Sequence, residues 1–129
     1  MKKGVGLWGP VILYIGFIFW VSSSYRPIPG IEFFPQIDKL FHALEYLPLG
    51  TLLIRAFYRT WGQAPRGGPP AAMGRSWRAG LRAVTLLAAM IVGALDEWYQ
   101  GSVPGKETEF WDLFADTVGA ALGEAVYRF

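Results

Sequence analysis

The stretch AVTLLAAMIVGALDEWYQ, residues 83–100, decides the fold, because a run of uncharged residues over 83–95 ends in the acidic pair Asp96 and Glu97. A helix needs about 20 predominantly apolar residues to cross the hydrocarbon core of a bilayer. The uncharged run is shorter than that. If this stretch spans a membrane, both carboxyl groups therefore lie at or inside one boundary of the hydrocarbon region.

Three other apolar stretches lie on either side of this one. We predict spans at about 5–25, 37–58, 80–99 and 111–127 in a chain of 129 residues, of which 53% are hydrophobic. Soluble domains contain about 45–50% apolar residues even when glycine is counted. The sequence therefore predicts an all-α integral membrane bundle of four transmembrane helices, formed by a single domain over residues 1–129.

The segments around these spans carry turn and breaker residues. Prolines in 25–35 exclude regular structure, so we expect an outer loop there, and the linker 59–79 contains the flexible sequence APRGGPPAAMG. Pro48 lies inside the second span, where we expect a kink. The first span has an alternative as a cleaved signal peptide with its cleavage region at Ser22–Ser24, although its apolar part exceeds the usual length of about 7–15 residues.

Basic and acidic residues are segregated along the chain. Six arginines and no acid occur in 55–82, whereas six acids and the single basic residue Lys106 occur in 96–116. Lys and Arg are retained on the cytoplasmic side of membranes, so we expect both termini and the linker in the cytoplasm and two extracytoplasmic loops. The net charge of +2 implies no nucleic-acid partner, and the absence of cysteine excludes disulfides and thiolate metal sites.

Polar residues recur at the outer ends of three predicted helices. Asp38, His42 and Glu45 have the spacing i, i+4, i+7 and therefore share one helix face, and the pairs Asp96 with Gln100 and Asp112 with Asp116 are each four residues apart. Ionisable groups in a membrane are costly, by about 2.5–3.5 kcal/mol each at a helix centre. We therefore expect these faces to converge on one acidic pocket, with Lys39 and Lys106 as the nearby cations.

Two further features follow from residue types. Carboxylates with one imidazole suit a divalent cation, for which the candidate ligands are His42, Glu45, Asp96, Asp112 and Asp116. Small residues at Ala115, Gly119 and Gly123 form a ridge that lets the fourth helix approach a neighbour closely. We expect this ridge to serve packing within one chain, with a homo-oligomer as the alternative.

Three runs of residues carry a family pattern. They are Asp38-Lys39-Leu40-Phe41-His42 with Tyr46 and Gly50, then Asp96-Glu97-Trp98-Tyr99-Gln100 with Pro104-Gly105, then Asp112 ahead of Gly119 and Gly123. In order and spacing they resemble the VanZ-like family of small bacterial membrane proteins. Lys106 stands where that family usually has arginine, and Asp116 stands where asparagine is usual, so this site is more acidic than the family pattern.

The resemblance implies a multi-pass protein of the bacterial cytoplasmic membrane that acts in the cell envelope, and it adds Tyr46 to the expected site. The founding member of the family is associated with resistance to the glycopeptide teicoplanin. We therefore expect a pocket that binds a lipid head group, an envelope precursor or a lipid-tailed glycopeptide, formed by Asp38, Lys39, His42, Glu45, Tyr46, Asp96, Glu97, Gln100, Lys106, Asp112 and Asp116.

Two other functions remain open from the sequence. One is a metal-dependent intramembrane enzyme acting on a lipid-linked substrate, with Glu45 or His42 as general base. The other is a structural or cation-handling membrane protein, because buried carboxylates can relay protons or select cations. The acids lie almost entirely in the half of the predicted bundle that faces outward, which favours ligand binding over a conduit across the membrane.

Overall fold

The computed structural model describes residues 2–24, 37–61, 74–106 and 108–128, without the side chains of residues 2 and 3. These residues form helices α1 (Lys2–Ser23), α2 (Ile37–Trp61), α3 (Arg75–Gln100) and α4 (Phe110–Val126), with no strand among the described residues. The predicted all-α fold is thus observed. The expected outer loop 25–35 and the central part of the expected linker lie outside the described residues.

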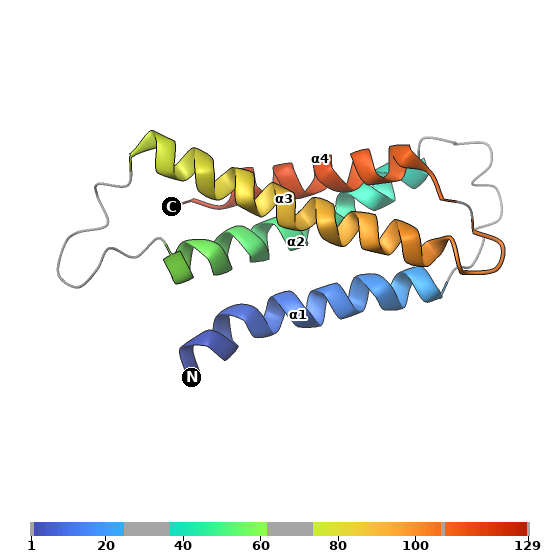
Figure 1. The fold of residues 1–129 in the computed structure, drawn as a ribbon, viewed down its shortest axis with the longest axis horizontal. Coiled ribbons are helices and arrows are strands. Elements are labelled where there is room, and N and C mark those ends of the chain that lie inside the picture. Colours follow the sequence, from blue (N-terminus) through green and yellow to red (C-terminus); the bar gives the residue numbers. More distant parts are fainter. Residues whose placement is uncertain (1, 25–36, 62–73, 107, 129) are drawn as a thin grey trace.

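The helices run alternately up and down, so both termini lie at one end of the bundle (Figure 1). α1 packs against α2 and α3, and α4 lies on the far side of the bundle from α1 (Figure 1). The opposite end brings together the last turns of α1 and α3 and the first turns of α2 and α4, because alternate helices point the same way. We call this the polar end, after the side chains described below.

The helix boundaries differ from the predicted spans by up to three residues, except at the start of α3, where the difference is larger. α3 begins at Arg75, ahead of the predicted span at 80–99, and so extends into the expected linker. The first turns of α3 contain arginine, alanine and tryptophan, which are compatible with a helix and need no membrane around them. α2 is one continuous helix that includes Pro48.

α2 and α4 are in backbone contact. A Cβ atom added at Gly50 would collide with the carbonyl oxygen of Ala120, and one added at Gly119 would collide with the carbonyl oxygen of Ala43. Gly123 is equally restricted, and its own carbonyl oxygen accepts a hydrogen bond of 2.8 Å from Thr51 Oγ1. Small residues on both helices therefore permit an approach that a side chain would prevent.

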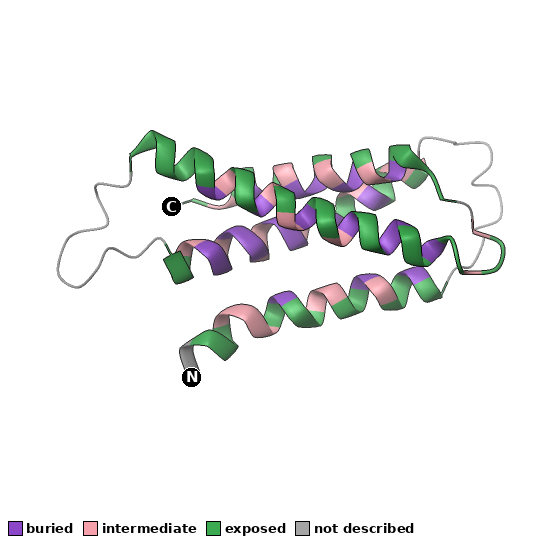
Figure 2. Ribbon diagram, in the orientation of Figure 1, coloured by how far each residue is buried: buried purple, intermediate pink, exposed green. Residues whose placement is uncertain are grey.

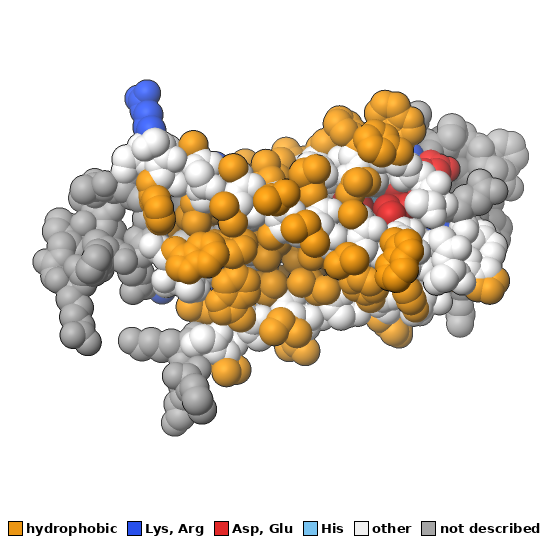
Figure 3. All heavy atoms as spheres, in the orientation of Figure 1, with side chains coloured by type: hydrophobic (Ala, Val, Ile, Leu, Met, Phe, Trp, Pro, Cys, Tyr) orange, Lys and Arg blue, Asp and Glu red, His pale blue; other side chains and the backbone are white. Residues whose placement is uncertain are grey.

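Every helix exposes residues on its outer side (Figure 2), and the face of the bundle drawn in Figure 3 is largely apolar. Large hydrophobic side chains are exposed on every helix, for example Leu13 on α1, Leu44 on α2, Leu87 on α3 and Phe114 on α4. Two helices, over Gly4–Ser23 and Arg75–Gln100, are long and apolar enough to cross a membrane. α4 has only 17 residues and α2 carries several charges, so neither of these helices meets that criterion.

Polar side chains occupy part of the interior of the bundle. The buried polar residues are Ser22, His42, Thr85, Asp96, Glu97, Gln100, Asp112, Asp116 and Glu124. Most of them lie at the polar end, where acidic atoms are visible between apolar side chains (Figure 3). Glu124 lies near the other end and interacts electrostatically with Arg82.

Candidate functional site

The first turn of α2 carries a partly exposed ion-pair cluster, which we call the Lys39 cluster. Lys39 Nζ donates to Asp38 Oδ2 at 3.3 Å and to Glu109 Oε2 at 2.5 Å, and it also contacts Asp112 Oδ1. The Asp112 side chain is only 4% exposed, whereas Asp38 and Glu109 are half exposed. One ammonium group therefore links the starts of α2 and α4 and compensates part of the negative charge there.

One helical turn deeper lies a second group, His42 with Glu97 and Asp116, which we call the His42 centre. His42 Nδ1 is 2.8 Å from Asp116 Oδ1, and His42 Nε2 is 3.6 Å from Asp112 Oδ2. Glu97 Oε2 accepts a hydrogen bond of 3.4 Å from the backbone N–H of Glu109. Three helices thus supply one imidazole and two carboxylates, all of them at most 5% exposed.

The third group, the Asp96 cluster, joins the last turns of α1 and α3. Ser22 Oγ donates to Asp96 Oδ1 at 2.6 Å, and the Gln100 amide donates to Asp96 Oδ2 at 2.8 Å and to Ser22 Oγ at 3.1 Å. All three side chains are at most 2% exposed. These hydrogen bonds compensate the loss of hydration of both Asp96 oxygens, whereas Gln100 Oε1 has no partner among the described residues.

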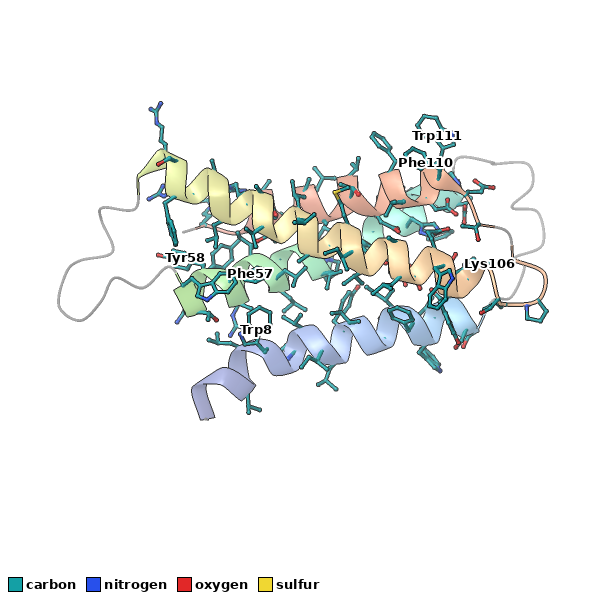
Figure 4. All side chains as sticks on the ribbon, in the orientation of Figure 1. Trp8, Phe57, Tyr58, Lys106, Phe110 and Trp111 are labelled. Atoms are coloured by element: carbon teal, nitrogen blue, oxygen red, sulfur yellow. The ribbon has the colours of Figure 1, made fainter. Side chains whose placement is uncertain are left out.

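Other predicted residues lie close to these groups with fewer contacts. Tyr46 is fully buried, and its hydroxyl has no hydrogen-bond partner among the described residues. Glu45 Oε1 is also buried without such a partner, while the Glu45 carbonyl oxygen accepts a 2.7 Å hydrogen bond from the Tyr14 hydroxyl. Lys106, in the turn after α3 (Figure 4), interacts electrostatically with Glu45 and Asp96.

Two hollows flank the polar groups. A groove of about 550 Å³ between α2 and α4, which we call the α2/α4 groove, is lined by Lys39, Leu40, Ala43, Trp111, Phe114, Ala115 and Val118. A second hollow of about 790 Å³ lies between the end of α3 and the start of α4 and includes Glu97 and Glu109 in its lining. Phe110 and Trp111 project outward from the first turn of α4 beside these hollows (Figure 4).

The sequence predicted that the polar residues converge on one pocket, and the structure gathers most of them at the polar end in the three groups described above. Of the predicted residues, Lys39 lines the α2/α4 groove and Glu97 lines the second hollow. Glu45 Oε1 has no hydrogen-bond partner among the described residues, and the remaining carboxylates, those of Asp38, Asp96, Asp112 and Asp116, hydrogen-bond or pair with neighbouring side chains. Mutual compensation of buried polar groups explains this, because an unpaired carboxylate facing an apolar hollow would cost more than a paired one.

Sequence reasoning missed the role of one residue and understated another. Ser22, considered only as part of a cleavage region, forms two hydrogen bonds in the Asp96 cluster. Glu109, counted above only among the six acids of 96–116, pairs with Lys39. Ser22 shares the one buried face of α1 with Val11 and Ile18, but α1 is apolar all round, so its sequence carries no period that would identify this face.

Comparison with known proteins identifies the family of the chain. The model of the VanZ/LLP1 family matches residues 10–129, which is nearly the whole chain and includes every residue of the three polar groups. No curated protein and no solved structure matches. Two helices apolar enough to span a membrane agree with a membrane protein. On the extent of the family match, the chain belongs to the VanZ/LLP1 family.

Proposed function

We propose that all four helices cross the bacterial cytoplasmic membrane, with both termini in the cytoplasm and the polar end facing outward. Exposed apolar side chains on α2 and α4, such as Leu44 and Phe114, support this, because continuous apolar surfaces of this extent are rare on soluble monomers. The orientation is supported by the six arginines in 55–82, which are expected on the cytoplasmic side.

Single-cysteine accessibility tests this topology directly, because the chain contains no cysteine of its own. Ser102→Cys lies in an exposed turn at the polar end, and Gly74→Cys lies at the exposed start of α3 near the other end. In intact cells, a membrane-impermeant maleimide should label Ser102→Cys about tenfold faster than Gly74→Cys, with the difference abolished by permeabilisation. Faster labelling of Gly74→Cys in intact cells would contradict the orientation.

We propose further that the polar end binds the head of an amphiphile whose tail lies in the α2/α4 groove. The observation that carries this proposal is the lining of the groove: six uncharged, mostly apolar residues and, at one end, Lys39, which borders the buried acids. A volume of about 550 Å³ falls within the range of small-molecule sites, which is about 300–1,000 Å³. The groove thus offers apolar area for a chain and charge for a head group.

The charges around Lys39 favour a particular head group. Asp38, Glu109 and Asp112 surround its ammonium group, so this end of the groove carries more negative than positive charge. An amine of the ligand would complement the carboxylates, and a phosphate would complement Lys39. We therefore propose a ligand with both groups, such as a zwitterionic lipid.

Binding of lysophospholipids to the protein in detergent tests this. Lysophosphatidylethanolamine should bind about tenfold more tightly than lysophosphatidylglycerol, which lacks the amine. Trp111→Ala removes a side chain that lines the groove, and it should weaken the binding of both lipids by about tenfold. An aromatic ring buried against a ligand contributes on the order of 1–2 kcal/mol to binding. Trp20→Ala, an exposed tryptophan on α1, is the matched control and should change neither affinity. Equal effects of the two tryptophan variants would contradict a groove site.

Membership of the VanZ/LLP1 family supports a role in the cell envelope, and the amphiphile could then be a lipid-linked envelope precursor or a lipid-tailed glycopeptide. Teicoplanin, which carries a lipid tail, should compete with bound lysophosphatidylethanolamine if it uses the same groove. A glycopeptide without a tail is the control and should not compete. Competition by both, or by neither, would leave teicoplanin outside the function of this chain.

A further inference from the structure

We propose that the His42 centre binds one divalent transition-metal ion through His42, Glu97 and Asp116. One ligand atom from each of these side chains lies within 4.8 Å of the others. His42 Nδ1 and Asp116 Oδ1 are already 2.8 Å apart. That separation is a hydrogen-bond distance. Two ligands bound to one ion at about 2.0–2.2 Å lie about 3.0–3.4 Å apart, so the two side chains would need to separate by only a few tenths of an ångström to hold an ion in place of this hydrogen bond.

The His42 centre also contains two buried oxygens without hydrogen-bond partners among the described residues. Glu97 Oε1 and Asp116 Oδ2 accept no hydrogen bond from the described residues, although Glu97 is 5% exposed and Asp116 is fully buried. A buried carboxylate oxygen without a partner costs about 1–3 kcal/mol or more. A cation between these side chains would compensate both oxygens at once, whereas the Asp96 cluster already has its own hydrogen bonds.

A neighbouring group of possible ligands is less suitable. Asp38, His42 and Asp112 also come within 4.8 Å of one another. However, the ammonium group of Lys39 contacts both Asp38 and Asp112, so a cation is already present among these carboxylates. His42 belongs to both groups, and the deeper one combines stronger burial with unpartnered oxygens.

The types of ligand atom in the His42 centre favour some metal ions over others. Imidazole favours zinc, iron, nickel and copper, whereas carboxylates alone favour magnesium, calcium and manganese. One imidazole with two carboxylates therefore suits Zn²⁺ or Mn²⁺ better than Mg²⁺, with a remaining position open to water. His42 Nε2 faces Asp112 at 3.6 Å, and a carboxylate beside the second ring nitrogen is a common way to orient a metal-binding histidine.

This site is distinct from the α2/α4 groove and does not depend on amphiphile binding. The test uses the full chain purified in detergent, stripped with a chelator and titrated with Zn²⁺, Mn²⁺ or Mg²⁺. About one Zn²⁺ or Mn²⁺ should bind per chain, at least about tenfold more tightly than Mg²⁺. Elemental analysis of the protein after dialysis gives the stoichiometry, and calorimetry gives the affinity.

Variants locate the ion. Glu97→Gln and Asp116→Asn should each weaken Zn²⁺ binding by at least about tenfold, because each replaces a charged ligand with a neutral amide. The control Asp38→Asn alters only the neighbouring group, and Glu124→Gln alters a buried carboxylate near the other end, so both should change the affinity less than about threefold. Visible absorption of bound Co²⁺ should change in Glu97→Gln and stay the same in Asp38→Asn.

The proposal is overturned if the wild-type protein retains neither Zn²⁺ nor Mn²⁺. It is also overturned if Asp38→Asn abolishes binding while Glu97→Gln preserves it, which would assign the ion to the neighbouring group. If a variant fails to fold, the wild-type protein still decides the question. Zn²⁺ at about 100 times its dissociation constant should raise the midpoint of thermal unfolding by several degrees, and an unchanged midpoint contradicts the site.

Discussion

The variant Gly119→Ala should lose about 3 kcal/mol of unfolding free energy, although it adds only one methyl group. The new Cβ atom would collide with the carbonyl oxygen of Ala43, which belongs to the backbone of α2 and cannot move alone. The two helices would have to separate, and the contacts around Gly123 and Gly50 would loosen with them. Equilibrium unfolding in mixed micelles, followed by far-ultraviolet circular dichroism, measures the loss.

The matched control for this change is Gly16→Ala on α1. No atom lies within 4 Å of a Cβ added at Gly16, which is exposed. Alanine is favoured over glycine in a helix by about 1 kcal/mol, so this variant should be unchanged or slightly more stable. Equal stability of the Gly16→Ala and Gly119→Ala variants would show that α2 and α4 do not make the close contact described here.

The variant Asp96→Ala should lose about 2–4 kcal/mol of unfolding free energy, because it leaves two buried hydrogen-bond donors without their acceptor. Ser22 and Gln100 both donate to the Asp96 carboxylate, and all three side chains are buried between α1 and α3. Ser22→Ala removes one donor and should cost about 1–2 kcal/mol. Unfolding of the single variants and of the double variant should give a coupling energy of about 1 kcal/mol or more between the two residues.

Ser102→Ala is the control for the serine change. Its hydroxyl also makes a hydrogen bond, of 2.6 Å to the carbonyl oxygen of Tyr99, but it is exposed in a turn. Water can replace that hydrogen bond, so the expected cost is below about 0.5 kcal/mol. Additive effects of Ser22→Ala and Asp96→Ala would mean that α1 does not dock on α3 through these side chains.

The four helices could be predicted because each contains a long apolar run, and runs of this kind form helices in a membrane. Spacing also identified residues that share a helix face, such as Asp38 with His42 and Asp112 with Asp116, and three of these four are buried at the polar end. Spacing within one helix reports only a face. It does not report which neighbouring helix that face contacts.

The rest of the site depends on contacts between helices. Nothing in the sequence near Ser22 indicates that its hydroxyl meets Asp96, 74 residues later in the chain. The small residues Gly119 and Gly123 indicated that α4 approaches a neighbouring helix closely. Which helix that is depends on how the helices rotate and cross, and the sequence did not identify α2 and its Gly50 as the partner. Similarly, the sequence does not indicate that Asp112 contacts Lys39 or that Asp116 lies 2.8 Å from His42, because these contacts join α4 to α2.

Photocrosslinking in native membranes tests the central claim, that the α2/α4 groove holds an amphiphile at the polar end. A photoreactive amino acid replaces Val118, which lines the groove, or Leu122, which is exposed one turn along the same helix and is not part of the lining. The Val118 probe should capture amine-bearing lipid about tenfold above its share of the membrane, whereas the Leu122 probe should capture lipids in proportion to their abundance. Capture in proportion to abundance at both positions would contradict that claim.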